Sequence, residues 1–157
     1  MNQAVQALPN PVAQWVTFRL DCDTYGINVM QVQEVLRVSE ITPVPGSPDF
    51  VRGIINLRGH VVTVVDARRR FNLPAIATSD DSRIVITETG GQVVGMLVDS
   101  VAEVLELRAD QVETAPNVGN DESTRFVQGV CSHGGELLIL IDLNQLLGDV
   151  VAPGGGV

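Results

Sequence analysis

The sequence predicts an all-β protein built from two similar small barrels that pack side by side. Valine and isoleucine supply much of its apolar content of 45%, and their branched side chains favour strands. The apolar runs are short and are separated by turn residues at close spacing. This pattern is typical of small barrels, because a closed barrel leaves few exposed sheet edges. An internal repeat then indicates that the barrel unit occurs twice.

The repeat is clearest in two hairpin-like stretches. Residues 50–66 recur 76 positions later as residues 126–142, and residues 25–36 align with residues 94–105 at an offset of 69. The offset grows only across loops, as expected for a duplicated unit that has acquired loop insertions. The matched positions of the longer stretch are Phe50 and Phe126, Gly53 and Gly129, Gly59 and Gly135, and Asp66 and Asp142.

Strand signals follow one another along each repeat. The first repeat predicts strands at 15–21, at 25–29 and twice within 50–66, and the second predicts them at 83–89, at 92–98, at 101–107 and twice within 126–142. The apolar spacing at 30–36 fits either one helical turn or a bent strand. Asp66 and Asp142 each precede a short helix, 67–71 and 143–147, that its side chain can cap. Prolines mark a loop at 43–48, and 74–82 and 108–125 are irregular.

These elements predict one domain over residues 15–148. Its two subdomains are expected at roughly 15–73 and 83–148, and the sequence leaves open whether they exchange strands. Residues 1–13 are expected to be a flexible N-terminal arm, and 149–157 a flexible C-terminal tail.

The composition excludes several classes of protein. A net charge of −9 argues against nucleic acid as a partner, and the basic run Arg68–Arg70 is expected to form a solvated helix face. Two cysteines and two histidines give neither a disulfide framework nor a zinc ligand set, so no metal or cofactor is expected. No stretch has the length of a membrane helix and no secretory signal is evident. We therefore expect an intracellular protein without membrane insertion.

Catalytic residues are not indicated. His60 and His133 lie outside any nucleophile motif, and the repeated positions of Asp66 and Asp142 favour helix capping over acid–base chemistry. A small thiol hydrolase that uses Cys131 or His133 is the remote alternative. A buried structural cysteine is the favoured interpretation of Cys131, because its segment is predicted as a strand and no base is fixed beside it. An enzyme is not expected.

Arg58 is the strongest binding candidate. The second copy of the hairpin lacks the arginine, so the scaffold does not require it. Its planar guanidinium can hold a carboxylate or several carbonyls of a partner. Glu34 is a further candidate, although Glu103 at the matching position favours a local structural role. Core packing is the alternative explanation for Val32, Val101 and Val104.

Several motifs together resemble the CheW family of bacterial chemotaxis coupling proteins. The resemblance covers about Trp15 to Gly148. It rests on Tyr25-Gly-Ile, Val32-Gln-Glu-Val, Pro48-x-Phe-x-x-Gly-x-x-Asn-Leu-Arg-Gly59, Val65-Asp66 and Val94-Gly-x-x-Val-Asp-x-Val101. The family fold is two five-stranded SH3-like barrels around a shared core. Its members are adaptors without enzymatic activity that bridge chemoreceptor tips to the regulatory domain of a CheA-type histidine kinase.

The resemblance also implies site residues, a location and a pathway. It places Glu34, Arg58, Val101 and Val104 at the receptor surface, Val32 and Gly53 at kinase docking, and Asn56, Gly59 and Gly95 at either surface or in the fold. The location implied is the cytoplasm, in receptor arrays beneath the inner membrane. The alternative is an adaptor of another CheA-linked pathway, such as pilus-based motility.

Overall fold

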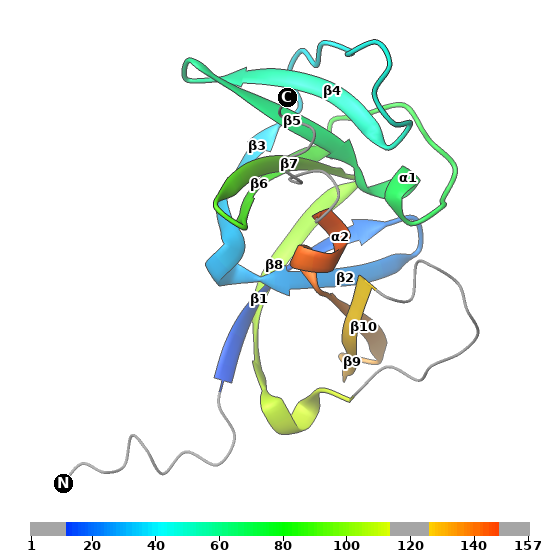
Figure 1. Ribbon diagram of the computed structural model, residues 1–157. Coiled ribbons are helices and arrows are strands. Elements are labelled where there is room, and N and C mark those ends of the chain that lie inside the picture. Colours follow the sequence, from blue (N-terminus) through cyan, green and yellow to red (C-terminus); the bar gives the residue numbers. More distant parts are fainter. Residues whose placement is uncertain (1–11, 114–125, 148–157) are drawn as a thin grey trace, which may run out of the picture.

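The computed structural model describes residues 12–113 and 126–147. Its strands are β1 (Val12–Leu20), β2 (Asp23–Asn28), β3 (Val32–Arg37), β4 (Val51–Leu57), β5 (His60–Asp66), β6 (Arg83–Thr89), β7 (Gln92–Val98), β8 (Ser100–Arg108), β9 (Val127–His133) and β10 (Glu136–Ile141). The short helices between them are η2 (Val29–Gln31), α1 (Ala67–Arg70), η3 (Ala109–Gln111) and α2 (Leu143–Leu147). The predicted all-β class with short helices is confirmed (Figure 1).

The strands form two five-stranded sheets with the same internal order. Barrel A is ordered β8-β1-β2-β10-β9 and barrel B is ordered β3-β6-β7-β5-β4. Isolated bridges bring opposite edges together: Thr42, after β3, pairs with Ile54 of β4, and Glu113, after β8, pairs with Val130 of β9. Each bridge has two backbone hydrogen bonds of 2.8 to 2.9 Å. The edge strands are therefore partly covered, as expected for small barrels.

The two sequence repeats do not coincide with the two barrels. Barrel A takes β1 and β2 from the first repeat and β8, β9 and β10 from the second, and barrel B takes the remaining strands. The exchange of strands follows the same pattern in both barrels. In barrel B, Gly95 of β7 faces Val64 of β5, and in barrel A its repeat equivalent, Gly26 of β2, faces Leu140 of β10. Each barrel therefore depends on both repeats for its strands.

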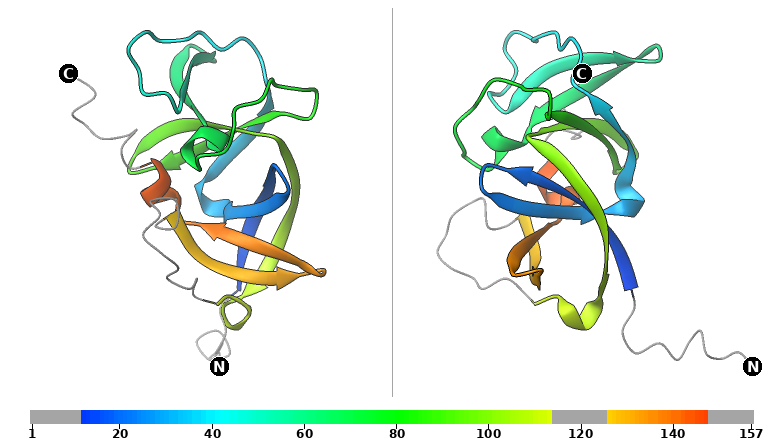
Figure 2. Two further views of the ribbon diagram at one scale, coloured as in Figure 1. Left: turned by 90° about the vertical axis from the view of Figure 1, so that its right-hand side faces the viewer. Right: turned by 180° about the vertical axis from the view of Figure 1, so that it is seen from behind.

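Three apolar clusters form the core. Barrel B is filled by a cluster that includes Val64 and Ile84, and barrel A by one that includes Trp15 and Leu140. The largest cluster lies between the barrels and draws on both, with members such as Phe18, Ile27, Val85, Met96 and Leu146. Figure 2 shows the two barrels one above the other, with α1 and α2 at their junction.

The local predictions concern the segment 30–36, the two aspartate caps and the start of β1. The ambiguous segment 30–36 contains both alternatives in succession, a 3-10 turn in η2 and then strand β3. Both aspartate caps are confirmed, since Asp66 Oδ1 accepts from the Arg68 amide at 3.0 Å and Asp142 Oδ1 accepts from the Asn144 amide at 3.1 Å. β1 begins at Val12, within the range expected to be an arm, because Val12 and Ala13 pair with β8.

Some expectations concern residues that the structure does not describe. Most of the N-terminal arm, the C-terminal tail with Gly148, and most of the loop at 108–125 lie outside the described residues. Within 12–113 and 126–147, no helix is long and apolar enough to cross a membrane.

The solvated face expected for Arg68–Arg70 is wrong for Arg68 and Arg70 and holds only for Arg69. Arg68 is only 7% exposed. The guanidinium of Arg70 lies 4.5 Å from the ring centre of Phe50 and 4.9 Å from that of Phe126, and Arg70 Nε donates to the Leu146 carbonyl at 2.9 Å. The short helix α1 is wedged between the barrels, so Arg68 and Arg70 face protein partners, whereas Arg69 keeps 46% of its side chain exposed.

Arg68 connects the barrels through two carboxylates. Its Nε and Nη2 donate to Asp99 at 2.8 and 2.7 Å, and Nη2 also lies 3.3 Å from Asp21 Oδ1. Asp99 lies between β7 and β8, and Asp21 lies in the β1–β2 turn. We call Arg68, Asp99 and Asp21 the Arg68 clasp. Burial alone raises the pKa of Asp99, but hydrogen bonds from Arg68 and the Asp21 amide outweigh it and hold that pKa below its usual value.

Gly53→Ala is expected to destabilise the protein strongly. Gly53 has a φ of +151°, and a Cβ there would lie 2.3 Å from the Thr42 carbonyl oxygen of the bridge in barrel B. Backbone strain and overpacking together predict a loss of about 2 to 4 kcal/mol in the free energy of unfolding, measured by urea titration. Gly129→Ala is the matched variant, where a Cβ would lie 2.7 Å from a Val112 methyl group and 2.9 Å from the Glu113 carbonyl oxygen, and where φ is not positive. We expect a smaller loss there, and equal losses would contradict this account of Gly53.

The Arg68 clasp makes stability depend on pH. Because the pKa of Asp99 is lower in the folded state, its contribution is present above the unfolded pKa of about 4 and is lost as pH falls through the folded pKa. Asp99→Asn should cost about 1 to 3 kcal/mol at pH 7, and the cost should shrink as the pH falls through the lowered folded-state pKa of Asp99. Asp110→Asn, which removes an exposed partner of Arg108 at 3.1 Å, is the control and should change little. A pH-independent cost for Asp99→Asn would refute the clasp's role.

Candidate functional site

The β4–β5 turn presents Arg58 in an unusual backbone conformation. Arg58 and Gly59 have φ values of 51° and 90°, as in the two-residue turns that favour glycine and asparagine. The Asn56 side chain accepts from the Gly59 amide at 2.8 Å and braces the turn. The repeat equivalent of Arg58 is Gly134, with a φ of 60°. The first hairpin thus carries an arginine at a conformational cost of about 1 kcal/mol that glycine avoids.

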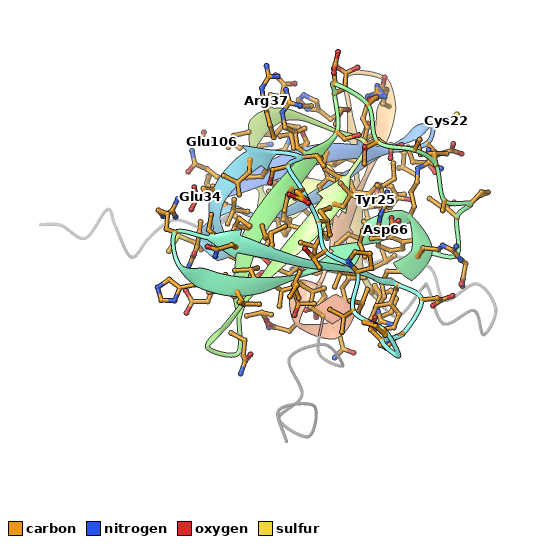
Figure 3. The ribbon with its side chains drawn as sticks, turned by 90° about the horizontal axis from the view of Figure 1, so that it is seen from above. Cys22, Tyr25, Glu34, Arg37, Asp66 and Glu106 are labelled. Carbon is orange, nitrogen blue, oxygen red and sulfur yellow. The ribbon has the colours of Figure 1, made fainter. Side chains whose placement is uncertain are left out.

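Arg58 pairs with Glu34, so two of the predicted receptor-binding residues lie together. Arg58 Nη1 donates to Glu34 Oε1 at 3.3 Å, and Nη2 contacts Oε2. The hydrogen bond lowers the pKa of Glu34 and raises the pKa of Arg58. The Arg58 side chain remains 69% exposed. Figure 3 shows Glu34 at the outer edge of the molecule, beside the tip of the β4–β5 hairpin.

A shallow groove of about 510 Å³ adjoins this ion pair on barrel B. Arg58 and His60 line it together with the exposed apolar side chains of Val61 and Val93, which are 69% and 37% exposed. Neither valine is predicted from the sequence, because both belong to apolar runs in which only the strand register decides which side chain points outward. The groove combines one cation with apolar surface, as binding surfaces commonly do.

The three predicted valines, Val32, Val101 and Val104, lie along the rim of the central core. Val104 pairs with Val16, and both side chains take the same face of the sheet, where Val16 belongs to the cluster between the barrels. Val104 is 52% exposed, so packing accounts for only part of its surface. Val32 and Val101 are half-buried against the same cluster, as the core-packing alternative proposed.

Val35 is a rim residue that the sequence analysis did not select. It is the repeat equivalent of Val104, pairs with Val85 of the central cluster and is 39% exposed. The alignment of the two repeats already matched the two valines, so that match was the signal that could have identified it. Val35 and Val104 thus present apolar surface from the edge strands β3 and β8, one on each barrel.

The remaining predicted positions build the scaffold beneath this surface. Gly53 and Gly95 are buried, and a Cβ on Gly95 would lie 2.9 Å from an Ile84 methyl group. Gly59 supplies the left-handed conformation that the turn needs. In these positions a substitution would act first through the backbone and the barrel core.

The residues considered for chemistry are poorly placed for it. Cys131 is 2% exposed and packs in the barrel A cluster with Trp15, and burial raises the pKa of its thiol, with Glu113 adding to the effect. A buried thiol with a raised pKa is a weak nucleophile. Among residues 12–113 and 126–147, no three histidine, cysteine or acidic side chains gather as metal ligands.

Comparisons with known proteins agree with this architecture. The family model of the CheW-like domain matches residues 14–151. The chemotaxis protein CheW of Klebsiella aerogenes is 33% identical over 85% of this chain and 81% of its own length, and that of Bacillus subtilis is 32% identical over 84% and 85%. The crystal structure of the scaffolding protein TtCheW from Thermoanaerobacter tengcongensis matches 87% of this chain and 93% of its own, with a TM-score of 0.81 and 36% identity. The chain belongs to the CheW-like domain family.

Proposed function

We propose that this protein is a non-enzymatic adaptor that couples chemoreceptors to a CheA-type histidine kinase. The observation that carries the proposal is Arg58, which occupies a glycine-type turn at a conformational cost and remains exposed beside Glu34. Family membership over most of the chain supports it. The protein would act in the cytoplasm, in arrays beneath the inner membrane, and would hold its partners without a chemical step.

The receptor side of the proposal uses Arg58, Glu34 and an apolar surface that we call the valine rim, formed by Val35, Val101 and Val104. A receptor tip made of paired helices offers an amphipathic ridge whose apolar side chains can pack against Val101 and Val104. Val35 extends this apolar surface onto barrel B. Arg58 would bind polar groups of the receptor at the edge of that contact, because a guanidinium has five donors and Glu34 takes only part of them.

The kinase side uses positions that shape barrel B. Val32 lies at the start of β3 and is half-buried, so it can contribute a small apolar contact to a docked domain. Gly53 is buried and would act by keeping β4 in place. Asn56, Gly59 and Gly95 would support either contact through the turn and the sheet. Because the resemblance gives the kinase regulatory domain the same fold, barrel-to-barrel docking is the expected geometry.

Arg58→Gly is the sharpest test of the arginine. Glycine suits the φ of 51°, so the free energy of unfolding should stay equal or rise by up to about 1 kcal/mol. Receptor binding should weaken by about 1 to 4 kcal/mol if Arg58 is a hot spot, and receptor-dependent kinase activation in a reconstituted mixture should fall accordingly.

The control for this variant is Arg19→Gly. Arg19 is also exposed and also pairs with a glutamate, Glu136, at 3.6 Å, but it lies on barrel A. We expect its receptor affinity to stay near that of the wild type. Unchanged receptor binding by a folded Arg58→Gly protein would refute the assignment of Arg58.

Val104→Asp tests the apolar rim. The carboxylate would place a charge where the receptor is proposed to bury apolar surface, so direct receptor affinity should fall by at least about tenfold. Ile76→Asp is the matched control, because Ile76 is 50% exposed and lies in the 74–82 loop away from the rim. Equal affinity losses in both variants, measured by co-sedimentation with receptor assemblies, would argue against a specific role for the rim.

A further inference from the structure

The chain passes between the two barrels at two junctions that the repeat makes equivalent. One passage leads from β7 of barrel B through Asp99 to β8 of barrel A. The other leads from β2 of barrel A through η2 to β3 of barrel B. Each passage lies near a short helix, α1 at the first and α2 at the second. Side-chain contacts at the two junctions can therefore be compared position by position.

The first junction is held by charge. Arg68 of α1 has only 9% of its side chain exposed and makes two hydrogen bonds to Asp99, at 2.8 and 2.7 Å. It also contacts Asp21 at 3.3 Å and the Pro74 carbonyl at 2.9 Å. The Asp21 amide in turn donates to Asp99 Oδ2 at 2.8 Å. The clasp thus joins α1, the passage and the β1–β2 turn in one network.

The second junction lacks all three charged groups of the clasp. The repeat equivalents of Arg68, Asp99 and Asp21 are Asn144, Met30 and Gly90. Asn144 Oδ1 accepts from Gln31 Nε2 at 3.4 Å and from the Thr89 hydroxyl. The Met30 side chain is 87% exposed, and Gly90 has no side chain to contribute. The Asn144 contacts at the second junction are therefore neutral hydrogen bonds, of which the one with Gln31 lies at the protein surface. Arg70 of α1 adds a hydrogen bond to the Leu146 carbonyl of α2 at 2.9 Å.

We propose that the two barrels move as a hinged pair, with the Arg68 clasp as the pivot and the η2–α2 junction as the side that opens. Hydrogen bonds between charged groups are stronger than neutral ones, and those of Arg68 are shielded from water. An exposed amide contact at 3.4 Å resists separation less. The central apolar cluster spans both barrels and limits the motion to a small rotation.

This motion would act on the candidate binding surface. η2 leads directly into β3, which carries Glu34 and Val35, whereas Val104 lies on β8 of the other barrel. Opening at η2 would change the position of β3 relative to β8 and thereby the shape of the valine rim. This consequence rests on the proposed function, but the hinge itself does not.

The test transplants the clasp to the second junction. The triple variant Met30→Asp, Gly90→Asp and Asn144→Arg places an arginine and two carboxylates at the equivalent positions. The backbone accepts Gly90→Asp, because Asp21 has a φ of 60° and so does Gly90, and a Cβ at Gly90 meets no atom within 4 Å. Met30 and Asn144 are exposed, so their replacement leaves the core intact. Asn144→Arg alone is the control, since it adds the cation without its partners.

The measurement is a distance distribution between the barrels. Arg37 of β3 and Glu106 of β8 are exposed repeat equivalents, both labelled in Figure 3, and suit spin labels after Arg37→Cys and Glu106→Cys in a Cys22→Ser background. We expect the wild type to show a major distance and a second, more open one. The triple variant should lower the open population by about tenfold, and the Asn144→Arg control, which loses the Asn144 acceptor without gaining carboxylate partners, should not lower it.

Two outcomes would overturn the hinge. One is a single narrow distance in the wild type, and the other is an identical distribution in a folded triple variant. If the triple variant does not fold, Asp99→Asn provides the opposite test, because weakening the pivot should broaden the distribution. An unchanged distribution in Asp99→Asn would also refute the proposal. The experiment needs neither receptor nor kinase, so its result is independent of the adaptor function.

Discussion

The burial of one apolar cluster between the barrels is the constraint on which the rest of the structure depends. Strands β1, β2, β5, β6, β7 and β10 and both α-helices contribute to it. Because each barrel also takes strands from both sequence repeats, neither repeat can complete a barrel on its own. Burial of this size is the main favourable term in folding. It explains why α1 is held at the junction and why Arg68 and Arg70, although charged, lie among protein partners.

The duplication lets each residue be judged against its equivalent. Positions that agree in both repeats, such as Phe50 and Phe126, serve the shared scaffold, since Arg70 stacks on both rings. Positions that differ carry what the scaffold does not need. Arg58 stands against Gly134 in the same backbone conformation, and Arg68 stands against Asn144 at the same helix position. The two differences are of different kinds: Arg58 is an exposed residue on the surface of barrel B, and Arg68 is a buried cation at one of the two junctions.

Local chemistry made the fold class, the hairpins and both helix caps predictable, because Asp66 and Asp142 act within two or three residues of themselves. Arg58 could be selected as a binding candidate because the second hairpin has Gly134 at the equivalent position. The burial of Arg68 was not, since its partners Asp99 and Asp21 are distant in sequence and approach only when the barrels pack. The exposure of Val35 and Val61 likewise depends on register, and a one-residue shift would turn those side chains to the other face.

The pairing of Arg58 with Glu34 would prepare the arginine for its proposed role in binding. A free arginine on a hairpin tip would lose much rotamer freedom on contact with a partner, and that entropy opposes association. Glu34 holds two guanidinium nitrogens beforehand and leaves other donors directed to solvent. The lowered pKa of Glu34 keeps the pair charged under ordinary conditions. Glu34 also lies on β3, which follows η2 directly, so the proposed opening at η2 would also move the partner of Arg58.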